Sequence, residues 1–323
     1  MTDLIASRRQ FARCSVAGLS AFATALAAAP RTSAPIQFRQ SDMLLELGAN
    51  ALARAADRSY FADGHRGAAL VAASTLIEQT HLQGPGEERI TQLLRLNWAD
   101  TELCKGFPEA DPVTAPDQVI GKALASGGAT LREVGHDVIF AMHAMYTFGR
   151  HPQLATAERV NGVCRLIQAI KPWRDDPADP EVQPPAFRDS QQFARFVLQE
   201  ALDAIPRFSG FGQGFAGHML TFGQALLQMS SGGGEEWAES CRPAFCKYVT
   251  QTRRGPAPTD RRIADHKQSM LRPDEAAYWQ NRGDRSLGIG HVFKYPAAYY
   301  GLLEQARDPA LEQKFEALAW QIF

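Results

Sequence analysis

The 323-residue sequence lacks three patterns that would have assigned it to a broad class. No run alternates apolar and polar residues with β-branched enrichment over a useful length, which disfavours a fold built on sheets. Beyond the N-terminal region, no stretch reaches the roughly 20 apolar residues of a membrane span, so we expect no stable span. Because 34 Lys and Arg stand against 35 Asp and Glu, we also expect no nucleic-acid partner.

Cysteine and the common catalytic motifs are scarce as well. The chain has five cysteines, and their spacings fit no zinc motif. An oxidising compartment would permit pairing of Cys104, Cys164, Cys241 and Cys246 without requiring it, and we expect Cys164 to be a buried thiol. The sequence contains no Gly-x-Ser-x-Gly, His-Glu-x-x-His, Cys-x-x-Cys-His or dinucleotide-binding fingerprint. The commonest named mechanisms therefore have no support.

The N-terminal region has the composition of an export signal. Arg8, Arg9 and Phe11 precede an uncharged run of small residues from 14 to 29. This segment resembles a twin-arginine signal, which implies the twin-arginine export machinery as a partner of the precursor and a periplasmic or secreted mature chain. We expect residues 1–34 to form the signal and its cleavage region, with cleavage after Ala27, and residues 35–323 to form a single domain.

A Gly-His pair occurs four times in similar surroundings. The histidines are His65, His136, His218 and His291, at intervals of 71, 82 and 73 residues. Each pair precedes a segment that is apolar around almost its whole circumference, which is typical of a helix in the middle of a protein. The regular intervals indicate an internal repeat.

Two more helices are expected around each Gly-His segment. The segments that precede the pairs are 42–58, 116–126, 190–205 and 273–281, and those that follow the central helices are 87–98, 156–170, 235–250 and 309–323. Acidic residues in the first turns of several of these segments favour helix initiation. The sequence therefore predicts an all-α fold of about twelve helices, made of four three-helix units in which Gly-His opens the central helix.

Long connections are expected only between the units, at 99–115, 171–189 and 251–272. About 20 extended residues reach some 60 Å, whereas a 15-residue helix is only about 22 Å long. Each connection can therefore return the chain to the same end of the molecule, so that all central helices run in one sense. This layout resembles the α/α-toroid class in its general architecture; a central four-helix core with outer helices is the other arrangement we expect.

The four Gly-His histidines are candidate metal ligands. The positive end of a helix dipole keeps an imidazole at its N-terminus neutral, which is the state that binds a metal or accepts a proton. If the four ends meet, His65, His136, His218 and His291 form a site for a transition metal such as Zn, Fe or Cu, or line an acid-base pocket. The alternative is that Gly-His only initiates helices, with each ring bonded to local backbone.

Three further residues are catalytic candidates. His143 lies two turns after His136, where the other units have alanine. Lys294 and Tyr295 replace apolar or small neutral residues of the other units, and burying a lysine is costly unless it is paired or neutral. We interpret them as a wall that faces substrate; a core histidine and a lysine that extends to solvent are the structural alternatives.

The function expected from these features is an exported enzyme with a histidine-lined, metal-binding pocket that acts on a small organic molecule or a carbohydrate. A metal-free lyase or hydrolase that uses His, Tyr and Lys is one alternative, and a non-catalytic ligand-binding protein is another. Asp63 and Asp137, which adjoin the histidine positions, are expected either to orient the imidazoles or to cap their helices.

Overall fold

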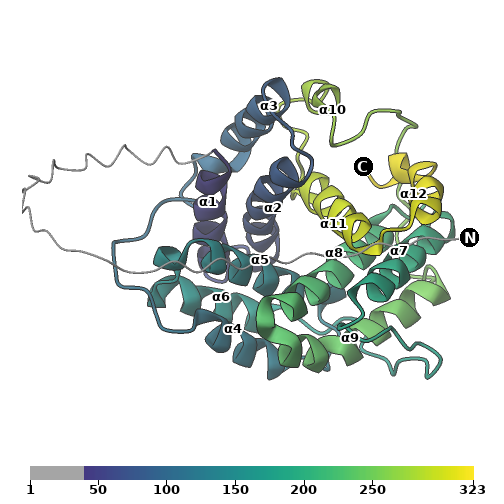
Figure 1. Ribbon diagram of the computed structural model, residues 1–323, viewed down its shortest axis with the longest axis horizontal. Helices are drawn as coiled ribbons and strands as arrows, with labels where there is room; N and C mark the ends of the chain where they lie inside the picture. Colours follow the sequence, from purple (N-terminus) through teal and green to yellow (C-terminus); the bar gives the residue numbers. More distant parts are fainter. Residues whose placement is uncertain (1–39) are drawn as a thin grey trace, which may run out of the picture. The chain divides into compact units, whose positions relative to one another are not determined.

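The computed structural model describes residues 40–323, and this part of the chain consists of helices and loops without a β-sheet (Figure 1). The α-helices are α1 (Gln40–Ala55), α2 (Tyr60–Gln79), α3 (Pro85–Leu94), α4 (Pro116–Ala125), α5 (His136–Arg150), α6 (Ala157–Ala169), α7 (Ser190–Arg207), α8 (Gly214–Met229), α9 (Glu235–Arg254), α10 (Ala276–Gln280), α11 (His291–Ala306) and α12 (Pro309–Glu316). Short 3-10 or π segments are η1 (Arg95–Ala99), η2 (Glu133–Gly135), η3 (Pro152–Leu154), η4 (Ser230–Gly234) and η5 (Ala319–Gln321). The predicted all-α fold of about twelve helices is confirmed.

The four helices that carry the Gly-His pairs form an inner ring. Helix α2 packs against α5, α5 against α8, α8 against α11, and α11 against α2. Most of their side chains are buried, as the lack of a polar face predicted. Helices α1, α6, α4, α9 and α7 pack around the outside of this ring (Figure 1). The arrangement is a central four-helix core with outer helices.

All four inner helices run in the same sense. Their histidines lie together, and residues three to ten positions after each histidine line one common chamber. The long connections that this requires are present as loops at 100–115, 170–189 and 255–275. The prediction of parallel central helices joined by long linkers is therefore confirmed.

Each Gly-His glycine allows the next inner helix to approach closely. A Cβ built on the glycine would lie only 2.2–2.6 Å from the residue four positions after the histidine of the neighbouring unit in the ring. The four pairs are Gly64 with Phe140, Gly135 with Phe222, Gly217 with Tyr295, and Gly290 with Ala69. The repeated glycine is therefore required for the close packing of the inner helices. The ring of helices is closed, because Gly290 of the last unit packs on Ala69 of the first.

The expectation that Gly-His opens every central helix is wrong for two of the four helices. Helices α5 and α11 do begin at His136 and His291, after a glycine whose φ of 91° suits a residue without a Cβ. Helix α2 begins at Tyr60 and α8 at Gly214, about a turn before their histidines. In these two helices the chain is already helical at the glycine. The close contact with the neighbouring helix is therefore the feature that requires a residue without a Cβ there.

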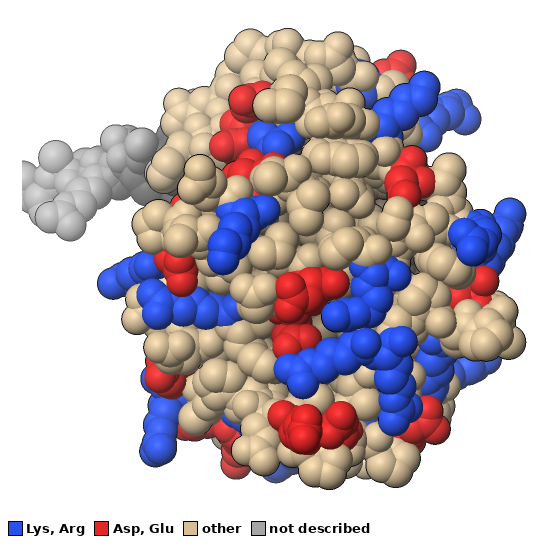
Figure 2. Space-filling view, turned by 90° about the vertical axis from the view of Figure 1, so that its right-hand side faces the viewer, with Lys and Arg blue, Asp and Glu red and all other residues tan. Residues whose placement is uncertain are grey.

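The remaining expectations from the sequence concern the surface charge, membrane spans, the cysteines and the export signal. Acidic and basic side chains are interspersed on the face shown in Figure 2. None of the helices in the described range is long and apolar enough to cross a membrane. The four cysteines of residues 40–323 are free thiols, and Cys164 is half-buried instead of fully buried. The expected export signal at residues 1–34 lies outside the described part of the chain.

Candidate metal centre

The four Gly-His histidines meet at the N-terminal ends of the inner helices. Going round the ring, the imidazole centroids are 4.3 Å apart for His65 and His136, 4.7 Å for His136 and His218, 5.0 Å for His218 and His291, and 4.9 Å for His291 and His65. Across the ring, His65 and His218 are 6.2 Å apart. Four histidines, of which the first and last are more than 220 residues apart in the sequence, thus form one cluster, which we call the histidine cluster.

Three members of the histidine cluster are close enough to share a metal ion. His65, His218 and His291 each offer a ring nitrogen, and these nitrogens all lie within 4.8 Å of one another. The Nε2 atoms of His65 and His291 are buried and have no hydrogen-bond partner. A buried imidazole nitrogen without a partner is costly, and a bound ion would remove that cost.

The rings of His136 and His218 face each other through two nitrogens that both lack a proton, which is an unfavourable contact. The Nδ1 atom of His218 lies 2.6 Å from the backbone oxygen of Gly214, and the Nδ1 atom of His136 lies against the backbone oxygen of Glu133. A carbonyl oxygen only accepts, so each Nδ1 carries the proton and each Nε2 presents a lone pair. These two Nε2 atoms are 3.1 Å apart. Two lone pairs at that distance repel unless a cation lies beside them.

Burial keeps the histidine cluster neutral. It is the main cause that lowers the pKa of all four rings, and for His218 the pKa falls to about 3. Lys294 is 3% exposed, and burial also lowers its pKa well below the usual lysine value. Within residues 40–323 none of the four rings forms an ion pair with a carboxylate. The cluster thus presents imidazole lone pairs without an acidic counter-charge.

Lys294 belongs to the histidine cluster, because its Nζ atom contacts Nδ1 of His65. The side chain is buried and does not extend to solvent, which removes the structural alternative considered for Lys294. The contact between Nζ of Lys294 and Nδ1 of His65 is a hydrogen bond whichever of the two atoms donates, and it fixes the direction of the His65 ring. Lys294 can therefore orient His65 in the way that backbone oxygens orient His136 and His218.

Tyr295 has a different place from the one expected. It is not among the residues that line the chamber, and it occupies the same packing position as Phe140 and Phe222 in the other units. Its ring stacks on His291 with a centroid distance of 4.6 Å and an interplanar angle of 13°, and its hydroxyl lies 3.2 Å from Nδ1 of His218. The tyrosine therefore positions two imidazoles.

The acidic neighbours of the histidines act at helix ends. Asp63 accepts a hydrogen bond from the backbone amide of Ser59 and pairs with Arg66 at 2.6 Å. Asp137 is 3% exposed, and burial raises its pKa to about 7 despite backbone hydrogen bonds that favour its charged form. Backbone carbonyls and Lys294, and not these carboxylates, contact the imidazole nitrogens. Of the two roles considered, helix capping is the one that the geometry supports.

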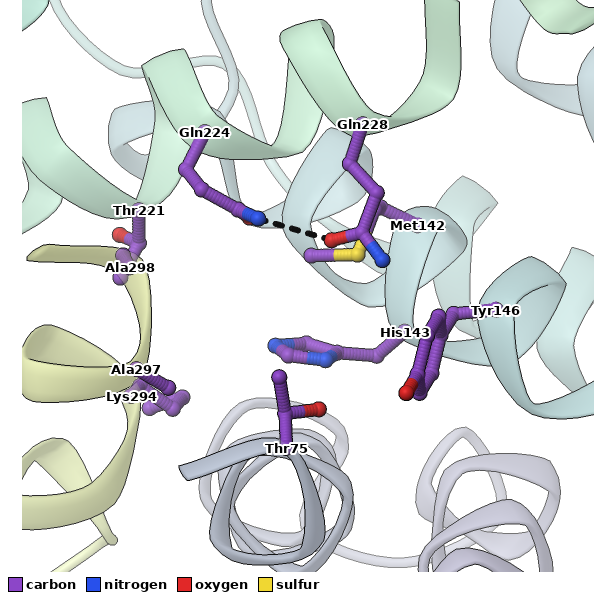
Figure 3. Close-up of a pocket in the computed structure, with 10 residues that line it drawn as sticks. All are labelled: Thr75, Met142, His143, Tyr146, Thr221, Gln224, Gln228, Lys294, Ala297 and Ala298. Atoms are coloured by element: carbon purple, nitrogen blue, oxygen red, sulfur yellow. Dashed lines mark hydrogen bonds between the residues drawn. The ribbon is translucent and has the colours of Figure 1, made fainter. Parts of the chain in front are cut away.

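A small chamber lies beyond the histidine cluster along the axis of the inner ring, and Figure 3 shows its lining. Thr221 and Lys294 lie three positions after their histidines, while His143 and Ala298 lie seven positions after theirs. The chamber volume is about 10 Å³, which is room for about one water molecule. The His143 ring points into the chamber and makes no hydrogen bond to another part of the described chain. Burial lowers its pKa to about 3.

The chamber adjoins two larger pockets toward the C-terminal ends of the inner helices, with volumes of about 340 and 280 Å³. Thr75, Tyr146, Gln224 and Gln228 line both the chamber and the pocket of 280 Å³. These residues were not among those predicted from the sequence. A polar side chain in an otherwise apolar central helix was the signal that could have identified them, above all the glutamines at positions 224 and 228.

Comparison of the chain with protein-family models, with curated proteins and with solved structures finds no match. The repeat, the histidine cluster and the pockets are thus the observations from which function must be argued.

Proposed function

We propose that this chain is an exported, metal-dependent enzyme that holds a transition metal in the histidine cluster and acts on a small organic molecule or a carbohydrate. The observation that best supports a bound metal is the pair of Nε2 lone pairs on His136 and His218, which face each other. Two nitrogen ligands at 2.0–2.1 Å from one tetrahedral ion would lie about 3.3 Å apart, close to the separation of 3.1 Å. A shared proton is the other cation that would fit, but the low pKa of both rings makes it unfavourable at neutral pH.

The donor set indicates the kind of metal. All of the candidate ligands are neutral imidazoles, which suit Zn, Cu, Fe and Ni, whereas Mg and Ca prefer oxygen ligands. His65, His218 and His291 would hold the ion, with His136 as a fourth ligand. Backbone oxygens at Nδ1 of His136 and His218 are the kind of outer partner that orients metal-binding histidines. When bound, such a metal supplies a Lewis acid or an activated water.

The pockets support a small substrate. Their volumes of about 340 and 280 Å³ are at the small end of ligand sites and suit a small organic molecule or a single sugar. His143 would act on the side of the chamber away from the histidine cluster. Because its pKa of about 3 keeps the ring neutral, it can accept a proton or a hydrogen bond from a ligand in the chamber.

A metal-free acid-base enzyme is the second candidate. His143 and Lys294 line the same chamber, and burial lowers the pKa of both side chains. Such a pair could take a proton from a substrate and stabilise the charge that develops, as in a lyase or a hydrolase. The same chamber would serve a non-catalytic binding protein if no turnover is found.

Metal analysis of the full chain, purified from its native host without chelator, tests the proposal. We expect a single transition-metal ion per chain. Changing His65, His218 or His291 to Ala should remove the metal, while His81→Ala should retain it, because His81 is an exposed histidine outside the histidine cluster. A metal-free native protein that also takes up no added Zn²⁺ or Cu²⁺ would contradict the metal proposal. The metal-free acid-base enzyme would then be the remaining enzymatic candidate.

A further inference from the structure

We propose that His291 is the exchangeable ligand of the histidine cluster, past which the metal ion enters and leaves on the N-terminal side of the inner ring. The other three imidazoles form the fixed part of the site. This inference rests on the proposed function, because it assigns different roles to the ligands of the proposed metal.

The second ring nitrogen distinguishes His291 from the other three imidazoles. Nδ1 of His65 contacts Nζ of Lys294. Nδ1 of His136 and Nδ1 of His218 each contact a backbone oxygen. Within residues 40–323 neither nitrogen of His291 has a hydrogen-bond partner, and its Nε2 atom is buried. Because such partners fix the orientation of metal-binding histidines, three rings are fixed in this way and His291 is not.

His291 is also the most exposed member of the histidine cluster. The exposed fraction is 0% for His65, 1% for His136 and 7% for His218, whereas His291 is half-buried. A ring nitrogen of His291 nevertheless lies within 4.8 Å of ring nitrogens of His65 and His218. The residue thus borders both the cluster and the surface. An ion that arrives from solvent meets it before the three enclosed rings.

The backbone of His291 is constrained less than that of the other ligands. His65 and His218 lie inside α2 and α8, about a turn after these helices begin. His291 is the first residue of α11 and follows a loop, 281–290, in which most residues are exposed. His136 also begins its helix, but a backbone oxygen holds its ring. Because helix ends open more readily than helix interiors, His291 can move away from the cluster without disturbing the inner ring.

The chamber side of the histidine cluster is closed to a hydrated ion. The chamber has room for about one water molecule, and none of the four cluster histidines lines it. Lys294 lies between the chamber and the cluster, since it lines the chamber and contacts His65. A hydrated metal ion needs more room than one water molecule, so it approaches from the N-terminal side.

Stacking on Tyr295 is the contact that holds the His291 ring. The two rings are nearly parallel, with centroids 4.6 Å apart, and stacked rings can slide past each other because no hydrogen bond joins them. Phe140 has the equivalent position in the second unit, beside His65 and His136. Loss of the Tyr295 ring should therefore free His291. Loss of the Phe140 ring should not free its neighbours, because their second nitrogens keep their partners.

Carbethoxylation of the full chain with diethyl pyrocarbonate, mapped by mass spectrometry, tests this inference without a substitution. In the metal-free chain we expect His291 to react at least about tenfold faster than the other three cluster histidines. Zn²⁺ should protect His291, because the reagent attacks a nitrogen that lacks a proton, and a ring bound to metal through one nitrogen carries its proton on the other. His81 is the control, since it is exposed outside the cluster and should react in both states.

Release of Zn²⁺ to excess EDTA measures the exchange itself. Tyr295→Leu should release the ion about tenfold faster than the parent, and the matched Phe140→Leu should release it at the parent rate. Equal release by the two variants would overturn the inference. So would a metal-free chain in which another cluster histidine reacts as fast as His291, or in which none reacts. A parent chain that takes up no Zn²⁺ would overturn the proposed function itself, and this inference with it.

Discussion

Lys294 places an amine against His65 at a depth where a lysine is costly, and this contact would position His65 as a ligand of the proposed metal. Lys294→Met keeps an unbranched side chain as far as Cε and removes the amine. We expect the affinity for Zn²⁺ to fall about 10- to 100-fold, as for other losses of a partner that orients a metal-binding histidine. Competition with a chromophoric chelator measures this change.

Stability separates this role from a structural one. Because methionine fills a similar volume, the free energy of unfolding of metal-free Lys294→Met should stay within about 1.5 kcal/mol of the parent. Lys122→Met is the control, since Lys122 is exposed on α4 and should change neither quantity. Unchanged affinity together with a large loss of stability would show that Lys294 only supports the fold.

His143 should make the metal-free protein sensitive to acid. Its pKa is about 3 in the folded chain and about 6.5 when unfolded, so the unfolded state binds the proton more readily between these values. Stability is therefore complete above pH 6.5 and falls as the pH decreases toward 3. At pH 4.5 the contribution of this one group to the loss is about 2–3 kcal/mol.

Urea unfolding of His143→Gln at pH 7 and 4.5 measures this contribution. The variant should lose about 2–3 kcal/mol less than the parent between the two pH values, because glutamine does not titrate. His81→Gln should behave as the parent does, since His81 is exposed. The other buried histidines act equally in all three proteins and cancel from the comparison. If the parent and His143→Gln lose the same free energy of unfolding between the two pH values, the ring of His143 is in contact with water in the folded protein.

At the scale of the elements, the Gly-His glycines should be sensitive to substitution, because each allows close contact between two inner helices. Gly135 precedes α5 with a φ of 91°, and a Cβ there would lie 2.3 Å from the ring of Phe222. Gly135→Ala should therefore lower the free energy of unfolding by about 2–5 kcal/mol, through backbone strain and overpacking combined. Chemical denaturation checks this, and metal content should fall with it, because His136 is the next residue.

Gly149 offers a control on the same helix. It lies near the end of α5, has no atom within 4 Å of a built Cβ, and is exposed. Gly149→Ala should stabilise the protein by about 0.5–1 kcal/mol, because alanine loses less conformational freedom on folding. If both substitutions change the free energy of unfolding in the same direction, the close contact between α5 and α8 is not the reason that position 135 requires glycine.

At the scale of the whole molecule, export is the prediction that concerns the residues before the described range. Changing Arg8 and Arg9 together to Lys keeps the charge but removes the arginine pair that resembles a twin-arginine signal. We expect the precursor to remain unexported, whereas Arg13→Lys should be exported normally. Fractionation and intact-mass measurement check both, and the exported chain should lack roughly its first 27 to 34 residues. Normal export of the double variant would exclude twin-arginine dependence.

Local patterns in the sequence were sufficient for the helices and their order. Apolar periodicity, first-turn acids and helix-breaking connections act over a few residues, so the twelve helices and the three long loops could be predicted. The largest error at a C-terminal end is in α12, which ends at Glu316 and not at residue 323. The four equivalent Gly-His positions predicted the histidine cluster, because parallel repeats bring equivalent positions together. The starts of α2 and α8 were missed because a glycine within a helix leaves the same local pattern as one before it.

Only the tertiary structure decided which atoms of those residues meet. The 3.1 Å contact between His136 and His218, the burial of Lys294 on His65 and the stacking of Tyr295 on His291 depend on helices far apart in the sequence. The role of Tyr295 changed for this reason, since its packing position is defined by Gly217 of the neighbouring unit. The chamber likewise arises from the register of four helices, which no local pattern contains.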